Sequence, residues 1–200
     1  MKNYLEIDLS ALENNIDVIQ KHVGNSVTVA PVVKANAYGI GVDELIKSFE
    51  NKNIQVVFVA TVEEAINLRR AGYSKEIITL NELLPYEANK IVDFGITAGV
   101  SDENVANEIN KCAKTENKIA KIHVEVDTGM GRIGIKPENM LNFIKRVNSL
   151  TNIEIEGIYT HFSSADCDAE YTKLQVEKFN NVLENLEKQG FNFKYIHASA

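Results

Sequence analysis

The 200-residue sequence has few features that would divide the chain or direct it to a membrane. It contains only three prolines and no linker or low-complexity stretch, so one sizeable core is expected. No apolar run approaches the roughly 20 residues that cross a bilayer. The start, Met1-Lys2-Asn3-Tyr4-Leu5-Glu6, lacks the apolar segment of a signal peptide. We therefore expect neither a membrane span nor a secretory signal.

Basic charge and cysteine are also scarce. The formal net charge is -7 and no basic block stands out, which argues against a nucleic-acid surface. The two cysteines, Cys112 and Cys167, lie far apart without a CxxC partner, so we interpret them as free thiols in a reducing compartment. The expected location is the cytoplasm, with no nucleic-acid partner, no membrane partner and no metal site.

What recurs instead is a β-rich apolar run followed by an amphipathic run with helical spacing. The predicted strands are Val27–Lys34, Gln55–Ala60, Glu76–Leu80, Ile96–Val100, Ile119–Asp127, Ile153–His161 and Phe191–Ala198. The predicted helices are Val42–Phe49, Val62–Ala71, Pro85–Val92, Asp102–Lys114, Pro137–Asn148 and Ala169–Gln189. This alternation implies an α/β fold with a parallel sheet and right-handed crossovers. Seven such units predict an incomplete (β/α)8 TIM barrel, and an open doubly wound sheet is the alternative.

One predicted strand stands outside this repeat. The run Leu5–Leu9 alternates like a strand, and Ser10 is placed to cap a following helix. Ser101 is the expected cap of the helix over Asp102–Lys114. Because the Leu5–Leu9 strand does not belong to the repeat, we expect it to pair with something other than the barrel.

Catalytic groups of such a barrel lie at the carboxyl ends of its strands. Lys34 closes an apolar strand, and desolvation would activate its amine as a nucleophile. The alternative is a lysine that reaches out to solvent along an apolar stem. Tyr38 and the backbone N–H of Gly39 follow and could meet an anion, although a tyrosine can also simply fill a core.

Two further strand ends carry polar clusters. In Asp127-Thr128-Gly129-Met130-Gly131-Arg132-Ile133-Gly134, three glycines allow a tight loop, and the arginine suits a carboxylate or phenolate. The alternative is a surface loop with a solvated arginine. His161 ends another strand, within Thr160-His161-Phe162, and could equally be a structural histidine with satisfied hydrogen bonds.

Together these segments resemble the alanine racemase family. Val33-Lys34-Ala35-Asn36-Ala37-Tyr38-Gly39 is similar to its cofactor-lysine signature, and the loop from Asp127 to Gly134 and Thr160-His161-Phe162 match its other barrel motifs in order. Glu6-Ile7-Asp8-Leu9 resembles the family's first strand. The resemblance implies that residues 1–10 contribute a strand to a C-terminal β-domain outside this chain, and that residues 11–200 form the incomplete cofactor-binding barrel.

The resemblance also implies roles for individual residues. Lys34 would hold pyridoxal 5'-phosphate covalently and act as the base on one face of the substrate Cα, and Tyr38 would bind the cofactor phosphate. Arg132 would bond the phenolic oxygen of the cofactor and help hold the substrate carboxylate. His161 would pack against the pyridine ring, and His197 would support an arginine that lies outside this chain.

The activity implied is racemisation of a small amino acid, from L-alanine to D-alanine for peptidoglycan. The second base would be a tyrosine of the partner subunit in a homodimer. A serine or broad-specificity racemase is a close alternative, and a non-catalytic cofactor carrier or a decarboxylase on the same barrel is more distant. Racemisation needs one base on each face of Cα, so this chain alone should not racemise efficiently.

Glu125 departs from the family pattern. Many members carry a lysine there that reacts with CO2 to form a carbamate facing the arginine. His123, Glu125 and Asp127 share one face of the predicted strand. Our hypothesis is that Glu125 replaces the charge of the carbamate and orients Arg132, directly or through a water. The alternative is drift to a solvated side chain.

Overall fold

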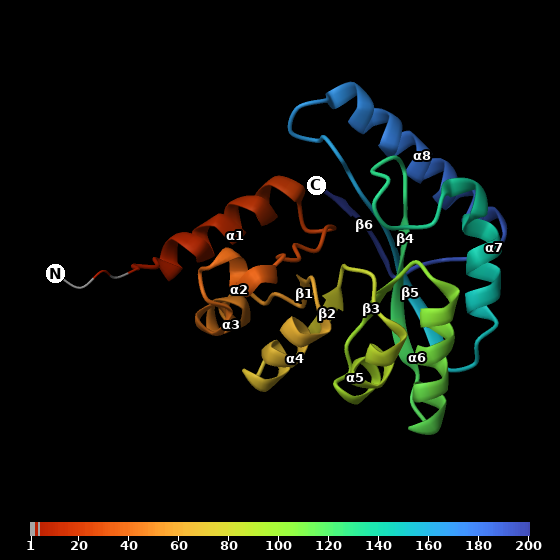
Figure 1. Cartoon of the computed structure of the whole chain (residues 1–200). Coiled ribbons are helices and arrows are strands. Elements are labelled where there is room, and N and C mark those ends of the chain that lie inside the picture. The colour runs from red at the N-terminus through yellow and green to blue at the C-terminus, as the bar shows by residue number, and fades with distance from the viewer. Residues whose placement is uncertain (1–2, 4) are drawn as a thin grey trace. The chain divides into compact units, whose positions relative to one another are not determined.

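The computed structural model describes residue 3 and residues 5–200. These residues form two units, 1–80 and 81–200, and each is described by itself (Figure 1). Every pair of neighbouring strands in both units runs parallel, as the sequence predicts.

The first unit carries a two-stranded sheet and four helices. Its elements are α1 (Leu9–Val23), α2 (Lys34–Tyr38), α3 (Val42–Asn51), β1 (Val56–Val59), α4 (Val62–Arg70) and β2 (Glu76–Thr79). All four residues of β1 are buried, so this strand is apolar throughout rather than alternating, as in parallel sheets covered on both faces. Helix α4 starts at a capping box made by Thr61 and Glu64, which fixes where the chain leaves β1.

The predicted strand over Val27–Lys34 is wrong in its extent. Only an isolated bridge between Val32 and Phe58 forms there, through Val33 N to Phe58 O and Phe58 N to Pro31 O, both at 2.8 Å. Pro31 has no N–H to donate, which removes one rung from any longer ladder. Lys34 therefore begins α2 directly after the bridge.

The predicted strand over Leu5–Leu9 is also not formed. Residues 5–8 lie outside any strand, and Leu9 is the first residue of α1; residues 1, 2 and 4 of the segment assigned to a second domain lie outside the described residues. A strand requires hydrogen bonds to a neighbouring strand, and residues 5–8 pair with no described segment. The helix is capped by Asp8, whose Oδ1 accepts Ala11 N at 3.0 Å, and not by Ser10 as predicted.

The second unit has a four-stranded sheet in the order β3-β4-β5-β6. Its elements are η1 (Pro85–Glu87), α5 (Ala88–Asp93), β3 (Ala98–Val100), α6 (Glu103–Thr115), β4 (Ala120–Val126), α7 (Pro137–Asn148), β5 (Ile153–His161), α8 (Ala169–Lys188) and β6 (Tyr195–Ser199). Strand order follows chain order, which is the topology of a barrel wall rather than of a doubly wound sheet.

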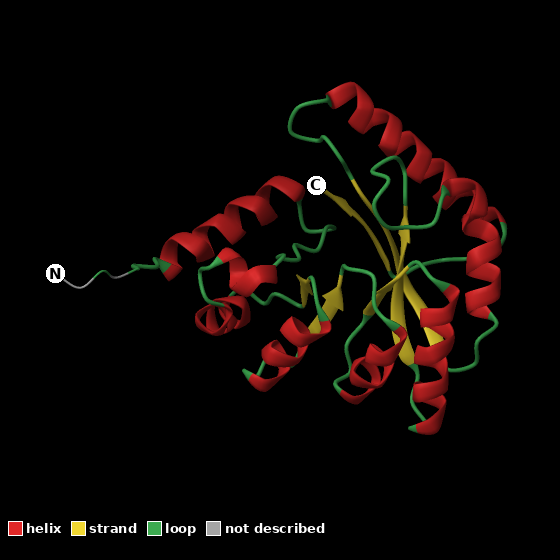
Figure 2. Ribbon diagram, viewed as in Figure 1, coloured by secondary structure: helices red, strands yellow, loops and turns green. Residues whose placement is uncertain are grey.

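Helices α6, α7 and α8 lie along the same side of this sheet (Figure 2). In α7 the buried side chains are Met140, Phe143, Ile144 and Val147, which recur at the three- and four-residue spacing of one helix face. Each buried side chain of this size contributes roughly 1.5–3 kcal/mol relative to full exposure. The buried apolar face of α7 therefore packs the helix against the sheet.

The register between β4 and β5 is interrupted once. Ile122 pairs with Ile155 but His123 pairs with Gly157, so Glu156 is passed over at an irregularity of the β-bulge type. An ideal Cβ on Gly157 would lie 2.6 Å from the ring of His123, so this position has room only for glycine. The bulge and the glycine together place a buried histidine against the strand.

The predicted bounds of α7 and β5 agree with the structure residue for residue. Helix α6 is capped by Asp102, whose carboxylate accepts Asn104 N at 2.5 Å, rather than by the predicted Ser101. Asp102 takes this place because Ser101 lies one residue too early to reach the N-terminal amides of the helix. None of the helices in the described part of the chain is long and apolar enough to cross a membrane.

Candidate functional site

Lys34 lies at the start of a left-handed turn in the first unit. The four residues after it, from Ala35 to Tyr38, have φ between 52° and 55° although none is glycine. This conformation costs roughly 1–2 kcal/mol for each such residue, because Cβ crowds the following carbonyl oxygen. Strain of this kind persists only where surrounding contacts impose it, and it is typical of functional segments.

Several contacts hold the turn in place. Ala37 N donates to Val33 O at 2.9 Å, Asn36 Oδ1 accepts Val42 N at 2.9 Å, and Ala35 N donates to Glu64 Oε1 at 2.7 Å. Ala37 is 3% exposed, so its methyl group is anchored in the core. The half-buried Lys34 is thus connected to a segment fixed at both ends.

Tyr38 is the last residue of this turn and is 65% exposed. It belongs to the same short segment as Lys34, as the motif predicts. The predicted use of the Gly39 N–H for an anion is wrong, because that group donates to Ala35 O and to Asn36 O, both at 3.1 Å. In the left-handed turn these two carbonyl oxygens face the N–H of Gly39, which therefore bonds within the turn.

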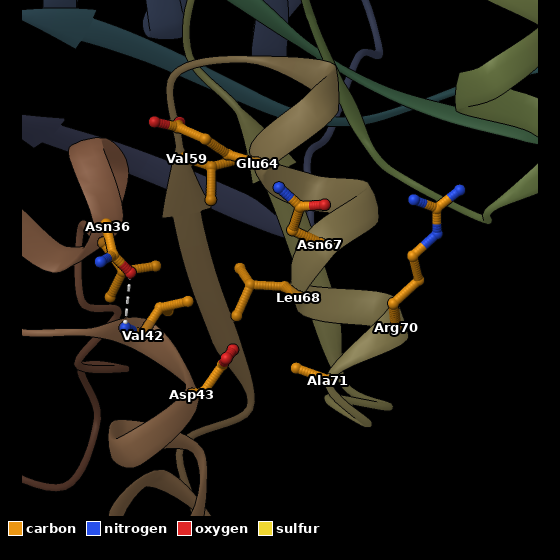
Figure 3. Close-up of a pocket in the computed structure, with 10 residues that line it drawn as sticks. Asn36, Val42, Asp43, Val59, Glu64, Asn67, Leu68, Arg70 and Ala71 are labelled. Carbon is orange, nitrogen blue, oxygen red and sulfur yellow. Dashed lines mark hydrogen bonds between the residues drawn. The ribbon is translucent and has the colours of Figure 1, made fainter.

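A pocket of about 500 Å³ lies beside the turn, within the first unit (Figure 3). Its walls come from the Lys34 turn, α3, the end of β1 and one side of α4. Asn36, Asp43, Glu64, Asn67 and Arg70 supply its polar lining. Figure 3 shows Arg70 pointing away from Asn36 and Val42, so the polar groups do not converge on one point.

In the second unit, the glycine loop after β4 is organised by Asp127. Its Oδ1 accepts Gly129 N at 3.0 Å and Gly131 N at 2.9 Å, which bends the chain back on itself. Gly134 has φ of 113°, and a Cβ there would lie 2.7 Å from Asp127 N. The glycines therefore allow the close backbone approach that the sequence predicts, and the exposed Arg132 lies between them.

Glu125 is 4% exposed and accepts a hydrogen bond from the Tyr159 hydroxyl at 3.0 Å. Burial raises the pKa of its carboxyl, while the Tyr159 hydrogen bond and the Arg132 charge lower that pKa in part. Within residues 81–200, all of which are described, no hydrogen bond or ion pair joins Glu125 to Arg132. The charge of Arg132 therefore lowers the pKa of this carboxyl without a direct contact, and the hydrogen bond to the carboxyl comes from Tyr159.

Tyr159 connects Glu125 to a pair of histidines. Its ring stacks on His197 with centroids 4.7 Å apart and an interplanar angle of 5°. His197 Nε2 lies 2.9 Å from His123 Nδ1, and His123 is fully buried. Burial lowers the pKa of His123 and lowers that of His197 to about 3. Both rings are therefore neutral at pH 7.

The far end of this row is a carboxylate between two lysines. Glu156 Oε2 lies 3.9 Å from His123 Nε2, and its Oε1 accepts from Lys121 at 2.6 Å and Lys194 at 2.9 Å. Three strands thus contribute polar groups to one row in the second unit, although the 3.9 Å between His123 Nε2 and Glu156 Oε2 is too long for a hydrogen bond.

His161 closes β5, where it pairs in register with Ser199 of β6. It is half-buried, and its carbonyl oxygen accepts from Gln175 Nε2 at 3.4 Å. Gln175 is fully buried and also donates to Thr128 Oγ1 at 3.2 Å, so it ties the end of β5 to the loop that carries Arg132. His161 lies at a strand end, as the sequence predicts.

The structure therefore groups the predicted residues within each unit. Lys34 and Tyr38 share one turn of the first unit. In the second unit, the charge of Arg132 lowers the pKa of Glu125. Tyr159 donates a hydrogen bond to Glu125 and stacks its ring on His197. Sequence reasoning missed the connecting groups Glu64, Tyr159, Glu156 and Gln175. Only Tyr159 had a usable signal, since it lies two residues before His161 on the same strand face.

A family model described as "Alanine racemase, N-terminal domain" matches residues 7–200. An alanine racemase of Halothermothrix orenii is 41% identical over 98% of this chain and 52% of its own length, and one of Methanococcus maripaludis is 42% identical over 98% and 53%. The chain thus spans about half the length of these curated relatives.

A solved structure, the alanine racemase of Clostridium difficile 630 in complex with cycloserine, has the same fold. The TM-score is 0.94 with 31% identity, over 99% of this chain and 56% of that one. With helices alternating with parallel strands, this confirms the predicted α/β fold class of an incomplete (β/α)8 barrel. From its match over residues 7–200 and these relatives, the chain belongs to the alanine racemase family, as its N-terminal portion.

Proposed function

We propose that the protein is a racemase of alanine that uses pyridoxal 5'-phosphate. The observation that carries this proposal is the family match over residues 7–200, which includes the Lys34 turn, the Arg132 loop and the His161 strand end. The product D-alanine would serve peptidoglycan synthesis in the cytoplasm. We propose that the part of residues 1–10 that precedes α1 adds a strand to a C-terminal β-domain and that residues 11–200 form the cofactor-binding barrel.

The residues present fit the cofactor by their chemistry. Within the described chain, the Lys34 amine has no carboxylate partner and follows the bridged residues of the strand end, so it is available to an aldehyde. Arg132 is exposed and likewise has no ion-pair partner among the described residues, which leaves its donor fork for a phenolate or carboxylate. We assign the cofactor phosphate to Tyr38 and the face of the pyridine ring to His161.

When bound, the cofactor delocalises the negative charge that develops at the substrate Cα. The protein has to remove a proton from one face of Cα and return one on the other. Lys34 acts as the base on one face, and Arg132 orients the substrate carboxylate. The base on the other face belongs to the partner subunit of a homodimer. His197 supports an arginine outside this chain, and its tie to His123 supports a fixed ring orientation.

Glu125 supplies a negative charge within the electrostatic reach of Arg132. We propose that it takes the place of the carbamate of other family members, with Tyr159 fixing the carboxyl. In support, its carboxyl is buried and engaged rather than solvated. An activity independent of added CO2 in the wild type, and lower in Glu125→Gln, is the expected result; equal activities would exclude this role.

The test of the proposed function is interconversion of the D and L forms of alanine and serine by the complete protein. Alanine is expected to be the faster substrate, and turnover is expected to disappear in Lys34→Ala together with the absorbance of the lysine-bound cofactor. Faster serine turnover would indicate the broad-specificity alternative. Cofactor binding without any turnover would indicate a carrier, and release of CO2 a decarboxylase.

A second measurement concerns the missing base. A chain of residues 1–200 alone is expected to racemise far more slowly than the complete protein, because it offers only one of the two bases. Comparable turnover by the two would contradict the assignment of the second base to a partner subunit.

A further inference from the structure

Glu64 makes more contacts than its place in α4 requires. Its Oε2 accepts Ala60 N at 2.8 Å and Thr61 N at 3.2 Å, while Thr61 Oγ1 accepts Glu64 N at 3.2 Å. These bonds complete the capping box of α4. They use only one of the two carboxylate oxygens as an acceptor, so the second oxygen is available to another segment.

That second oxygen reaches the Lys34 turn. Glu64 Oε1 accepts Ala35 N at 2.7 Å, across 29 positions of sequence. Figure 3 shows the Glu64 side chain extending from α4 across the end of β1, above Val59. A short bond from a backbone amide to a carboxylate is among the stronger protein hydrogen bonds.

Ala35 is the position where this bond has most influence on Lys34. It is the first residue of the left-handed turn, with φ 52° and ψ 47°, and its N–H belongs to the peptide that joins it to Lys34. Fixing this peptide fixes the orientation of the Lys34 backbone. The other contacts of the turn, at Asn36 and Ala37, act further along the chain.

We propose that Glu64 is a positioning residue for Lys34: its carboxylate holds the Ala35 amide and so sets the direction from which the lysine amine meets the cofactor. The inference rests on the proposed function, because it takes Lys34 as the cofactor lysine. One carboxylate thereby couples the start of α4 to the reactive turn, and the cap of a helix becomes part of the cofactor site.

The test compares Glu64→Ala with Thr61→Ala in the complete protein. Thr61→Ala breaks the capping box but leaves every bond accepted by the Glu64 carboxylate, so it is the matched control for lost capping. Glu64→Gln is a milder variant, because its single amide oxygen can accept Ala35 N or the Ala60 and Thr61 amides but not both sets.

Two readouts are needed. The first is hydrogen–deuterium exchange of residues 33–40 in the cofactor-free protein, and the second is the affinity for added pyridoxal 5'-phosphate. We expect Glu64→Ala to speed exchange and to weaken cofactor affinity, each by about tenfold, as the loss of one bond to a charged group implies. Thr61→Ala should change neither, and Glu64→Gln should fall between them.

Unchanged exchange or unchanged affinity in Glu64→Ala would overturn the proposal, as would equal changes in Glu64→Ala and Thr61→Ala. If Glu64→Ala does not fold, Glu64→Gln decides by the same criteria against Thr61→Ala. A wild-type protein that binds no pyridoxal 5'-phosphate would refute the proposed function and with it the role of Glu64. Exchange in the cofactor-free protein would still show whether the Glu64 contact exists, so the two failures are distinguishable.

Discussion

The two units hold their candidate residues in different ways. In the first, Lys34 begins a strained turn whose amide is tied down by a distant glutamate. In the second, Glu125 and His197 stand on regular strands and are joined through the buried Tyr159. The first arrangement depends on a few hydrogen bonds around irregular backbone, whereas the second depends on packing and on buried polar side chains of neighbouring strands.

This difference indicates where each unit is vulnerable. A polar row inside a sheet is costly to disturb, because any member left without its partner keeps the full penalty of burial. A strained turn can lose one contact and relax, with more effect on geometry than on folding. Substitutions that disturb the buried packing of the second unit should therefore act mainly on stability, and those of the contacts that hold the Lys34 turn mainly on the cofactor.

The largest effect on stability is expected from Gly157→Ala. The added methyl group would overlap the His123 ring, which has no space to move in the core. Overpacking of this kind costs about 3 kcal/mol of unfolding free energy, measured by urea denaturation. The same substitution in a His123→Ala background should cost much less. Equal costs in both backgrounds would show that the histidine ring is not the constraint.

The free energy of unfolding should decrease on acidification, because the buried histidines are neutral in the native state. The folded-state pKa of His197 is about 3, below that of an unfolded histidine, so the unfolded chain takes up a proton that the native state does not. Stability is full above the unfolded pKa and should fall by about 2 kcal/mol between pH 7 and pH 5. The decrease should be smaller in His197→Asn. A decrease of the same size in the wild type and in His197→Asn would mean that His197 does not contribute to it.

Tyr159→Phe removes the only hydrogen bond donated by a side chain to Glu125 among the described residues. We expect a loss of about 1.5 kcal/mol. Since burial already raises the pKa of the Glu125 carboxyl, the native state holds its proton to higher pH than the unfolded chain, and stability falls as pH rises through that folded-state pKa.

Loss of the tyrosine should strengthen this fall, and Glu125→Gln should abolish it. The measurement is urea denaturation of the two variants and the wild type from pH 4 to pH 8. A fall of the same size in the wild type and in Glu125→Gln would place the titrating group elsewhere.

The smallest expected loss of stability comes from removing a helix N-cap, and this loss should be the same in both units. Thr61 caps α4 in the first unit and Asp168 caps α8 in the second, each by accepting a backbone amide. Replacing either with alanine should cost about 1 kcal/mol. Calorimetric or denaturant measurements that gave very different costs would mean that the units also differ in their helices, and not only in how they hold the candidate residues.

The sequence predicts the regular elements better than the contacts between them. Pro137–Asn148 and Ile153–His161 have clear periodicity and end where the patterns end. The strand over Val27–Lys34 fails because Pro31 cannot donate to a ladder, although the composition is β-rich. The left-handed turn after Lys34 is not visible in the sequence, because Ala35, Asn36 and Ala37 have no common preference for positive φ.

The candidate residues were found through motifs, while their partners were not. Glu64 is 29 positions from the amide that it holds, and local rules explain it fully as a capping residue. Glu156 reaches His123 only because a bulge shifts the register between β4 and β5. Such contacts follow from the packing of distant segments, which periodicity does not encode.

The most direct test of the central claim is to locate the cofactor on the chain. The complete protein, loaded with pyridoxal 5'-phosphate, is reduced with borohydride, digested and sequenced by mass spectrometry. The pyridoxyl group is expected on Lys34, at close to one per chain, and Lys34→Ala should carry none. A modification on another lysine in the wild type, or none at all, would contradict the assignment of Lys34 as the lysine that holds the cofactor.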